Sequence, residues 1–177
     1  SIDYSYDFVA DDGKLTAGKP AQAIEDRIAQ VTQEAYDNGD YIFVAMDRHD
    51  EGDTFHPETK LFPPHNIAGT SGRELYGKLA SVYDAIKDDN RVFWMDKRHY
   101  SAFSGTDLDI RLRERRVTTV VLTGVLTDIC VLHTAIDAYN LGYDIEVVAS
   151  ATASLTPEAH DFAIGHFKNV LGATIVE

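Results

Sequence analysis

Apolar residues recur along the chain in two alternating periods. Between residues 21 and 35 they fall three or four positions apart, as on one face of an α-helix, and Asn38-Gly39 follows as a helix stop. Residues 41–46 then form a continuous apolar run, which is typical of a strand buried on both faces. The first third of the chain therefore predicts a helix followed by a buried strand.

The same alternation continues to the end of the chain, where Thr156-Pro157 marks a helix start and Gly142 a helix stop. Strands are predicted at 91–95, 117–123, 145–149 and 174–176, the most buried being 117–123, and helices at 108–114, 127–141 and 157–171. Alternating strands and helices predict an α/β fold, a three-layer α/β/α sandwich with a mainly parallel sheet and right-handed crossovers.

One long segment, residues 47–83, departs from this alternation. It is rich in Pro, His, Gly and Asp and has no strong period. Long irregular segments inside compact domains are usually functional or disordered, and the histidines and aromatic residues of this one argue against disorder. A chain of 177 residues is long enough for one domain with a substantial core, so we expect a single domain spanning residues 1–177.

Composition and charge exclude several classes of partner. The longest apolar run, residues 117–126, is far shorter than a membrane span. A formal net charge of -13 would repel a polyphosphate backbone, so we expect neither a membrane nor a nucleic acid as partner. The single cysteine allows no intrachain disulfide, and no secretory pattern opens the chain, so we expect a cytoplasmic location. The abrupt start at Ser1 leads us to expect a few preceding strand residues.

Three ionisable residues lie at predicted strand ends, where open α/β sheets bind their ligands: Asp3, Lys97 and Cys130. Alone, each has an ordinary explanation: a turn residue, a solvated surface charge and a small apolar core residue. A thiol at a helix N-terminus beside a lysine is expected to have a lowered pKa. Together the three supply the base, the cation and the nucleophile that amide hydrolysis through a thioester requires.

A second group of polar residues begins at the end of the predicted strand 41–46. Asp47 and His49 lie on the same side of an extended chain, and His65 follows sixteen residues after His49. An alternative is that this His-rich loop, which also holds Asp53, His56 and Glu58, is merely polar surface. Three protein ligands with open positions suit one divalent metal that also binds substrate, and Zn²⁺, Fe²⁺ and Mn²⁺ fit such a set.

Aromatic residues flank both groups in the sequence, and a flat heteroaromatic ring would stack among them, although aromatic residues also fill ordinary cores. They are Phe8, Phe62, Trp94, Tyr100 and Phe103.

Several of these segments carry a family resemblance that spans nearly the whole chain. Residues 2–8 (IDYSYDF) and 123–131 (TGVLTDICV) resemble the opening motif and the nucleophile motif of the isochorismatase-like cysteine hydrolases. Asp47-x-His49 with His65 resembles the metal set of their nicotinamidase/pyrazinamidase branch. Residues 62–66 (FPPHN) and 94–103 (WMDKRHYSAF) are most similar to the streptococcal type of bacterial nicotinamidase within that branch.

The resemblance implies roles for residues in this chain. Asp3, Lys97 and Cys130 would form the catalytic triad of a single cysteine-hydrolase domain. A divalent metal, with Zn²⁺ the first expectation, would be held by Asp47, His49 and His65, with Glu58 binding directly or through water. The resemblance further implies a cis peptide bond between Val125 and Leu126 and an oxyanion hole formed by the backbone N–H groups of Leu126 and Cys130.

The activity implied by the resemblance is metal-dependent hydrolysis of nicotinamide to nicotinate and ammonia, a step of NAD salvage, with pyrazinamide also accepted. The metal would bind the ring nitrogen, Phe8, Phe62 and Tyr100 would pack the ring, and the chain would self-associate. Alternatives are an isochorismatase or carbamoyl amidohydrolase of the same fold, or a catalytically silent metal-binding protein. Tyr6 departs from the branch pattern and leaves the role of Asp7 open.

Overall fold

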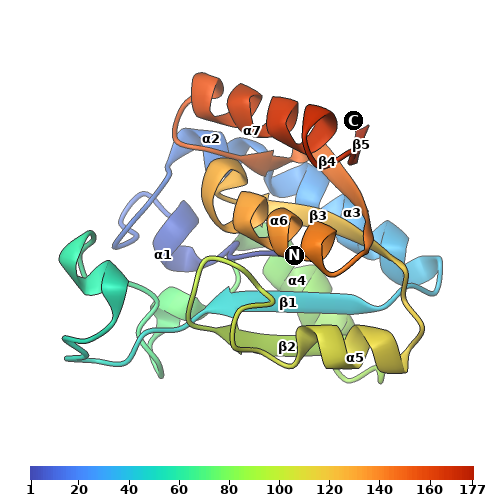
Figure 1. The fold of residues 1–177 in the computed structure, drawn as a ribbon. Coiled ribbons are helices and arrows are strands. Elements are labelled where there is room, and N and C mark those ends of the chain that lie inside the picture. Colours follow the sequence, from blue (N-terminus) through green and yellow to red (C-terminus); the bar gives the residue numbers. More distant parts are fainter.

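A parallel β-sheet forms the centre of the computed structural model, which describes residues 1–177 (Figure 1). The strands are β1 Ile42–Asp47, β2 Val92–Lys97, β3 Thr119–Val125, β4 Asp144–Ala153 and β5 Thr174–Val176. The α-helices are α1 Tyr6–Val9, α2 Lys19–Ala23, α3 Glu25–Asp37, α4 Gly77–Ile86, α5 Leu108–Glu114, α6 Leu132–Asn140 and α7 Pro157–Asn169. Short 3₁₀ turns span Pro57–Lys60 and Ser71–Arg73, and a π-helical turn spans Thr127–Val131.

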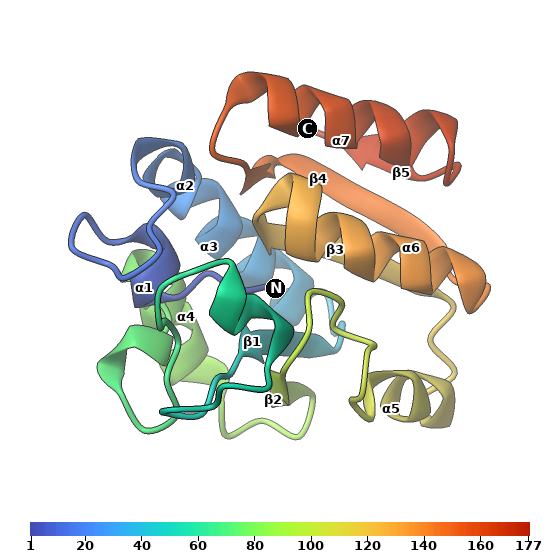
Figure 2. The ribbon, with the colours of Figure 1, turned by 60° about the vertical axis from the view of Figure 1, so that its left-hand side comes forward.

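The N-terminal residues join the two halves of the sheet. β1 pairs with β2, and β3, β4 and β5 pair in that order, all in parallel. Ile2 forms parallel bridges to both Ala45 of β1 and Gly124 of β3, and its N–H donates to Thr123 O at 2.9 Å. The N-terminus therefore lies in the middle of the molecule (Figures 1 and 2), and the residue after Ile2 lies at the centre of the sheet.

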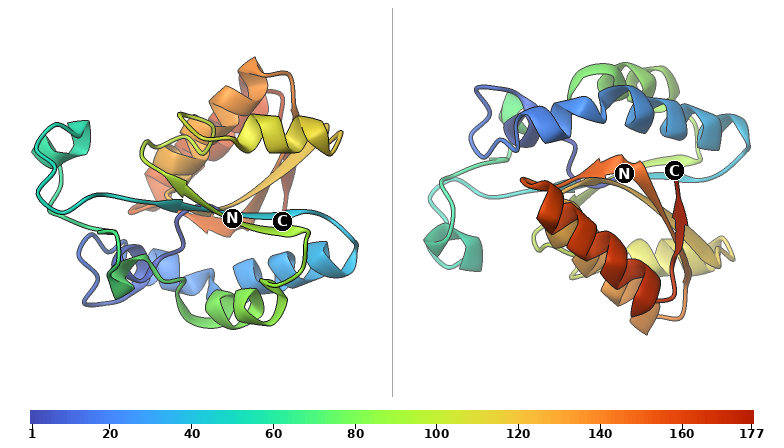
Figure 3. Two further views of the ribbon diagram at one scale, coloured as in Figure 1. Left: turned by 90° about the horizontal axis from the view of Figure 1, so that it is seen from below. Right: turned by 90° about the horizontal axis from the view of Figure 1, so that it is seen from above.

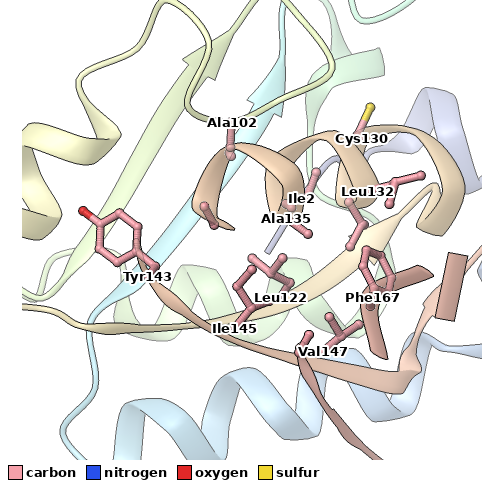
Figure 4. Packing of buried hydrophobic residues seen from close by; sticks show 14 of the residues in the cluster. Ile2, Ala102, Leu122, Cys130, Leu132, Ala135, Tyr143, Ile145, Val147 and Phe167 are labelled. Atoms are coloured by element: carbon pink, nitrogen blue, oxygen red, sulfur yellow. The ribbon is translucent and has the colours of Figure 1, made fainter. Parts of the chain in front are cut away.

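Helices cover both faces of the sheet, as the sequence predicted. Helices α1 to α4 lie on one side and α5 to α7 on the other (Figure 3). Two buried hydrophobic clusters fill the two interfaces, one including Ile28 and Leu79 and the other including Leu112 and Phe167 (Figure 4). The predicted three-layer α/β/α sandwich is thus confirmed. No helix is both long enough and apolar enough to cross a lipid bilayer.

Strand β3 is less buried than its sequence predicted. Residues 117–123 were expected to form the most buried strand, but Thr119 is exposed and Val121 is 49% exposed. Within β3, the N-terminal residues pair only at Gly124, through Ile2. The first half of β3 therefore has a neighbouring strand, β4, along one edge alone. β1, where only Phe43 is partly exposed, is the more buried strand.

The segment 47–83, expected to be irregular, contains the start of helix α4. Apolar residues do recur at helical spacing in it, but this pattern starts only at Leu79 and runs past residue 83, where the irregular segment was expected to end. The remainder of the segment forms the two 3₁₀ turns and connecting loops. Helix α4 packs against α3.

Gly124 is required where the N-terminal residues cross β3. Its φ is +116°, and a Cβ built at this position would lie 1.9 Å from the carbonyl oxygen of Ile2. Only a residue without a side chain lets the backbone at Ile2 approach β3 so closely.

We therefore expect Gly124→Ala to lower the free energy of unfolding in urea by about 3 kcal/mol or more, from steric overlap and an unfavourable φ. Gly142→Ala separates the two causes, because Gly142 has φ +81° but open space around it, and should cost about 1 kcal/mol. Gly165→Ala, within α7 with nothing near its Cβ position, should be neutral or stabilising by up to about 1 kcal/mol. Equal losses in Gly124→Ala and Gly142→Ala would contradict the steric explanation.

Candidate active site

Four ionisable or nucleophilic side chains converge at the carboxyl edge of the sheet. Asp3 follows the bridge at Ile2, Asp47 ends β1, Lys97 ends β2, and Cys130 lies in the π-helical turn after β3. Parallel strands end at the same edge, which is why residues far apart in the sequence meet there. Asp3, Lys97 and Asp47 are 0%, 1% and 3% exposed, so their charges interact with little screening by water.

Lys97 is the central residue of this group. Its Nζ lies 2.7 Å from Asp3 Oδ2, 3.7 Å from Cys130 Sγ and 3.6 Å from Asp47 Oδ1. It also donates to the carbonyl oxygen of His99 at 3.0 Å. The ammonium therefore contacts the sulfur and both carboxylates at once.

The backbone at Asp3 directs its carboxylate toward Lys97. Asp3 has φ 55°, a left-handed conformation that Asp adopts more readily than most residues. Its N–H donates to Ala45 O at 3.0 Å, and its Oδ1 accepts from the N–H of Asp47 at 2.7 Å. With Oδ1 held in this way, Oδ2 faces the ammonium.

Burial raises the pKa of the Asp3 carboxyl to about 6, with Lys97 opposing the shift. Burial also raises the pKa of the Cys130 thiol, and the charge of Lys97 offsets this only in part. The sequence had led us to expect a lowered thiol pKa; that expectation is wrong for this geometry, because desolvation outweighs attraction to the cation. Burial therefore favours the thiol over the thiolate, and the Asp3 carboxyl lies in the same buried group.

The turn that carries Cys130 is fixed on several sides. Thr134 Oγ1 donates to Cys130 O at 2.7 Å, and Ser154 Oγ donates to Asp128 Oδ1 at 2.7 Å. The peptide bond between Val125 and Leu126 is cis, as the family resemblance implied. The sulfur points away from the apolar side chains packed beneath α6 (Figure 4). The thiol is thus presented toward Lys97 instead of the core.

A second group adjoins Lys97 through Asp47. One ligand atom from each of Asp47, His49, Glu58 and His65 lies within 4.8 Å of the others, and all four residues are buried. Asp47 Oδ2 lies 2.8 Å from His49 Nε2 and 3.4 Å from His65 Nε2, and Glu58 Oε2 lies 3.7 Å from His65 Nε2. The structure therefore brings together all the predicted metal ligands.

The chemistry of this group fits a divalent cation. His65 Nε2 is buried without a hydrogen-bond partner, while its Nδ1 is 2.8 Å from Pro63 O. Burial and the neighbouring charge of Asp47 raise the pKa of Glu58, since two buried carboxylates repel each other. Two imidazoles and two carboxylates are a donor set that suits Zn²⁺, Fe²⁺ or Mn²⁺.

Asp7, whose role the sequence left open, supports the loop that presents His65. Its Oδ2 accepts from the backbone N–H of Asn66 at 2.8 Å, and its Oδ1 accepts from the N–H of Lys14 at 3.2 Å. Asn66 has φ 45°, so the chain turns sharply directly after His65. Asp7 thus acts on the histidine through the backbone of the next residue.

Arg73 is a site residue that the sequence did not suggest. Its Nε donates to Asp47 O at 2.9 Å and its guanidinium pairs with Asp96 at 2.6 Å, so it ties the ends of β1 and β2 together. It lies in the irregular segment, and no motif or spacing marked it.

Three of the five flanking aromatic residues lie at the site. The ring centroids of Phe8 and Phe62 are 5.3 Å and 6.2 Å from that of His65. The ring centroid of Tyr100 is 5.2 Å from that of His133, a residue that follows Cys130 by about one helical turn. The other two pack elsewhere, because Trp94 contacts Tyr83 and Phe103 stacks on Tyr143. Trp94 and Phe103 therefore follow the alternative that the sequence left open, in which aromatic residues make ordinary packing contacts.

Comparison with known proteins agrees with this geometry. A model of the isochorismatase domain matches residues 1–176. The crystal structure of a pyrazinamidase/nicotinamidase from Streptococcus mutans is 81% identical, with a TM-score of 0.98 over 99% of this chain and 97% of that one. The nicotinamidase/pyrazinamidase of Bacillus subtilis is 54% identical, with a TM-score of 0.98 over 99% and 96% of the two chains.

A more distant structure bears on the metal group. The pyrazinamidase of Pyrococcus horikoshii, solved in complex with zinc, is 26% identical to this chain, with a TM-score of 0.85 over 99% and 96% of the two chains. Its likeness covers the same full length as that of the closer relatives. With a family model matched from residue 1 to residue 176, the chain belongs to the isochorismatase family.

Proposed function

We propose that this protein is a nicotinamidase, which hydrolyses nicotinamide to nicotinate and ammonia through a thioester at Cys130. The observation that carries the proposal is the position of the Lys97 ammonium, 2.7 Å from Asp3 and 3.7 Å from the sulfur, directly beside the predicted metal group. The identity of 81% to a pyrazinamidase/nicotinamidase over nearly the whole chain supports the same substrate class. Pyrazinamide shares the ring nitrogen and carboxamide and is expected to react too.

In the acylation step, the Asp3 carboxylate takes the thiol proton as Sγ attacks the carboxamide carbon. The tetrahedral oxyanion is stabilised by the backbone N–H groups of Leu126 and Cys130. The N–H of Leu126 donates no hydrogen bond within the protein and so is free for this role. The carbon–nitrogen bond then breaks, ammonia leaves with the proton from Asp3, and the acyl group remains on sulfur.

In the deacylation step, Asp3 takes a proton from water and the resulting hydroxide attacks the thioester. The carbon–sulfur bond breaks, nicotinic acid leaves and loses its proton to water to become nicotinate, and the sulfur regains its proton from Asp3. Lys97 holds a positive charge beside Asp3 and the sulfur throughout, and its own pKa lies above the ordinary value because the surrounding anions outweigh burial. One carboxyl group thus carries out every proton transfer at the sulfur, the leaving ammonia and the attacking water.

Orientation of the ring is the task of the second group. Asp47, His49, His65 and Glu58 would hold a divalent ion, which supplies a Lewis-acidic position for the pyridine nitrogen. Phe8 and Phe62, whose rings lie close to His65, would pack against the ring of the substrate, and Tyr100 would close it from the side of Cys130. A ring held in this way places its carboxamide near the sulfur.

The proposal also covers the location, the domain organisation and the assembly of the protein. A single reactive thiol fits a reducing compartment such as the cytoplasm. Residues 1–177 would act as one cysteine-hydrolase domain, because both hydrophobic clusters pack on one sheet. Self-association follows from the family resemblance and can be tested by light scattering coupled to size-exclusion chromatography.

Replacement of the nucleophile tests the covalent mechanism. Cys130→Ala should lower the rate of ammonia release from nicotinamide by about 10³-fold or more, because no other group at the site can accept the acyl group. Mass spectrometry of the wild-type protein during turnover should show an adduct on Cys130. Metal content, measured in parallel, should stay at the wild-type level. Ammonia release that survives in Cys130→Ala would refute the mechanism.

Removal of the metal separates a nicotinamidase from an isochorismatase of the same fold. Chelation, or His49→Ala, should abolish stoichiometric metal and lower kcat/KM for nicotinamide by about 100-fold or more. His166→Ala is a matched control, since this histidine lies on α7, packs against Phe162 and is not one of the predicted metal ligands. Activity on nicotinamide that is unaffected by metal loss would favour the rival enzymes. Bound metal without turnover of any amide would favour a silent metal-binding protein.

A further inference from the structure

A third histidine of the irregular segment, His56, is buried beside the metal group but supplies none of its ligand atoms. Its side chain is 5% exposed, and its ring lies edge-on to that of His49 with centroids 4.6 Å apart. Both of its ring nitrogens have backbone partners. Nε2 bonds to the carbonyl oxygen of Arg98, and Nδ1 accepts from the N–H of Glu58 at 3.3 Å.

These partners fix the state of the ring. A carbonyl oxygen can only accept, so Nε2 carries the hydrogen, and a backbone N–H can only donate, so Nδ1 offers its lone pair. With both nitrogens bonded in this way, neither has a lone pair left for a metal. His56 is a bridge between two backbone segments and is distinct from the ligands His49 and His65.

One end of the bridge is attached to the catalytic strand end. Arg98 directly follows Lys97, and its guanidinium pairs with Asp50 and, at 2.8 Å, with Asp53. Asp53 Oδ1 in turn accepts from the N–H of His56 at 3.3 Å. The backbone and the side chain of Arg98 thus both hold the segment that carries His56.

The other end carries a predicted metal ligand. Glu58 lies on a short helical arm, residues 50–62, that stands away from the body of the molecule (Figures 1 and 3, teal). Phe55 on this arm is 96% exposed, whereas Glu58 is 7% exposed and turned inward. An arm with so little packing of its own needs a specific contact to set the position of an inward side chain.

We propose that His56 is a positioning residue: by linking the backbone N–H of Glu58 to the carbonyl oxygen of Arg98, it sets the Glu58 carboxylate against the other predicted ligands, Asp47, His49 and His65. The strand end that supplies Lys97 to the reaction then also determines the geometry of the metal group. This inference rests on the metal site of the proposed function and adds a residue that tunes it. Groups behind the ligands of a metal site commonly change its affinity by about 10- to 100-fold.

The test measures Zn²⁺ affinity of the metal-free protein by competition with a chromophoric chelator. His56→Ala, which removes both bonds, should weaken binding about 10- to 100-fold. His56→Asn keeps an acceptor for Glu58 N–H, and His56→Gln keeps a donor for Arg98 O. Each single-bond variant should fall between wild type and His56→Ala. Phe55→Ala, the neighbouring and fully exposed position, should bind Zn²⁺ as wild type does.

Two further measurements on the metal-free proteins distinguish positioning from a general structural role. The unfolding midpoint and the rate of Cys130 alkylation should be the same in His56→Asn, His56→Gln and wild type. The inference would be overturned if the single-bond variants bound Zn²⁺ more weakly and also showed a comparably lower unfolding midpoint and a comparably altered rate of Cys130 alkylation. Wild-type Zn²⁺ affinity in His56→Ala would overturn it as well. A wild-type protein that binds no Zn²⁺ would overturn the metal site itself and this inference with it, whereas equal binding in wild type and His56→Ala overturns this inference alone.

Discussion

The burial of one ammonium group organises this protein. Lys97 is 1% exposed, and a buried charge costs several kcal/mol unless partners compensate for it. Asp3 and Asp47 provide that compensation, at 2.7 Å and 3.6 Å, and the sulfur of Cys130 completes the contacts. These contacts require four segments to meet around the Lys97 ammonium: the N-terminal residues, the ends of β1 and β2, and the turn after β3. Displacement of any one of them would leave an unpaired charge inside the protein.

That requirement explains features that would otherwise look unfavourable. Asp3 holds a left-handed backbone conformation, and Gly124 allows the backbone at Ile2 to come into direct contact with β3. Both features bring the first residues of the chain between two strands from distant parts of the sequence. Within the same ion group, burial raises the pKa of Asp3 and the charge of Lys97 lowers it. The two opposing effects together leave the pKa of this carboxyl at about 6. Stability and reactivity here depend on the same contacts.

Asp47 links the two halves of the site. Its Oδ1 faces Lys97, and its Oδ2 faces His49, so the catalytic group and the metal group share one carboxylate. Burial alone would raise the pKa of Asp47, but the hydrogen bond with His49, the nearby His65 and the charge of Lys97 hold it below the ordinary value. A carboxylate at this position suits a cation on one side and an ammonium on the other. A substitution in either group is therefore expected to alter the electrostatics of both.

The sequence by itself determined the alternation of strands and helices, because apolar spacing reflects local burial, and its motifs marked Asp3, Lys97, Cys130 and the metal ligands. Tertiary structure decided what local pattern cannot carry. Half of β3 is exposed because it has one neighbouring strand, and the thiol pKa is raised by burial. The roles of Asp7, Arg73 and His56 likewise arise from contacts with backbone groups distant in sequence, and no spacing along a single chain encodes such contacts.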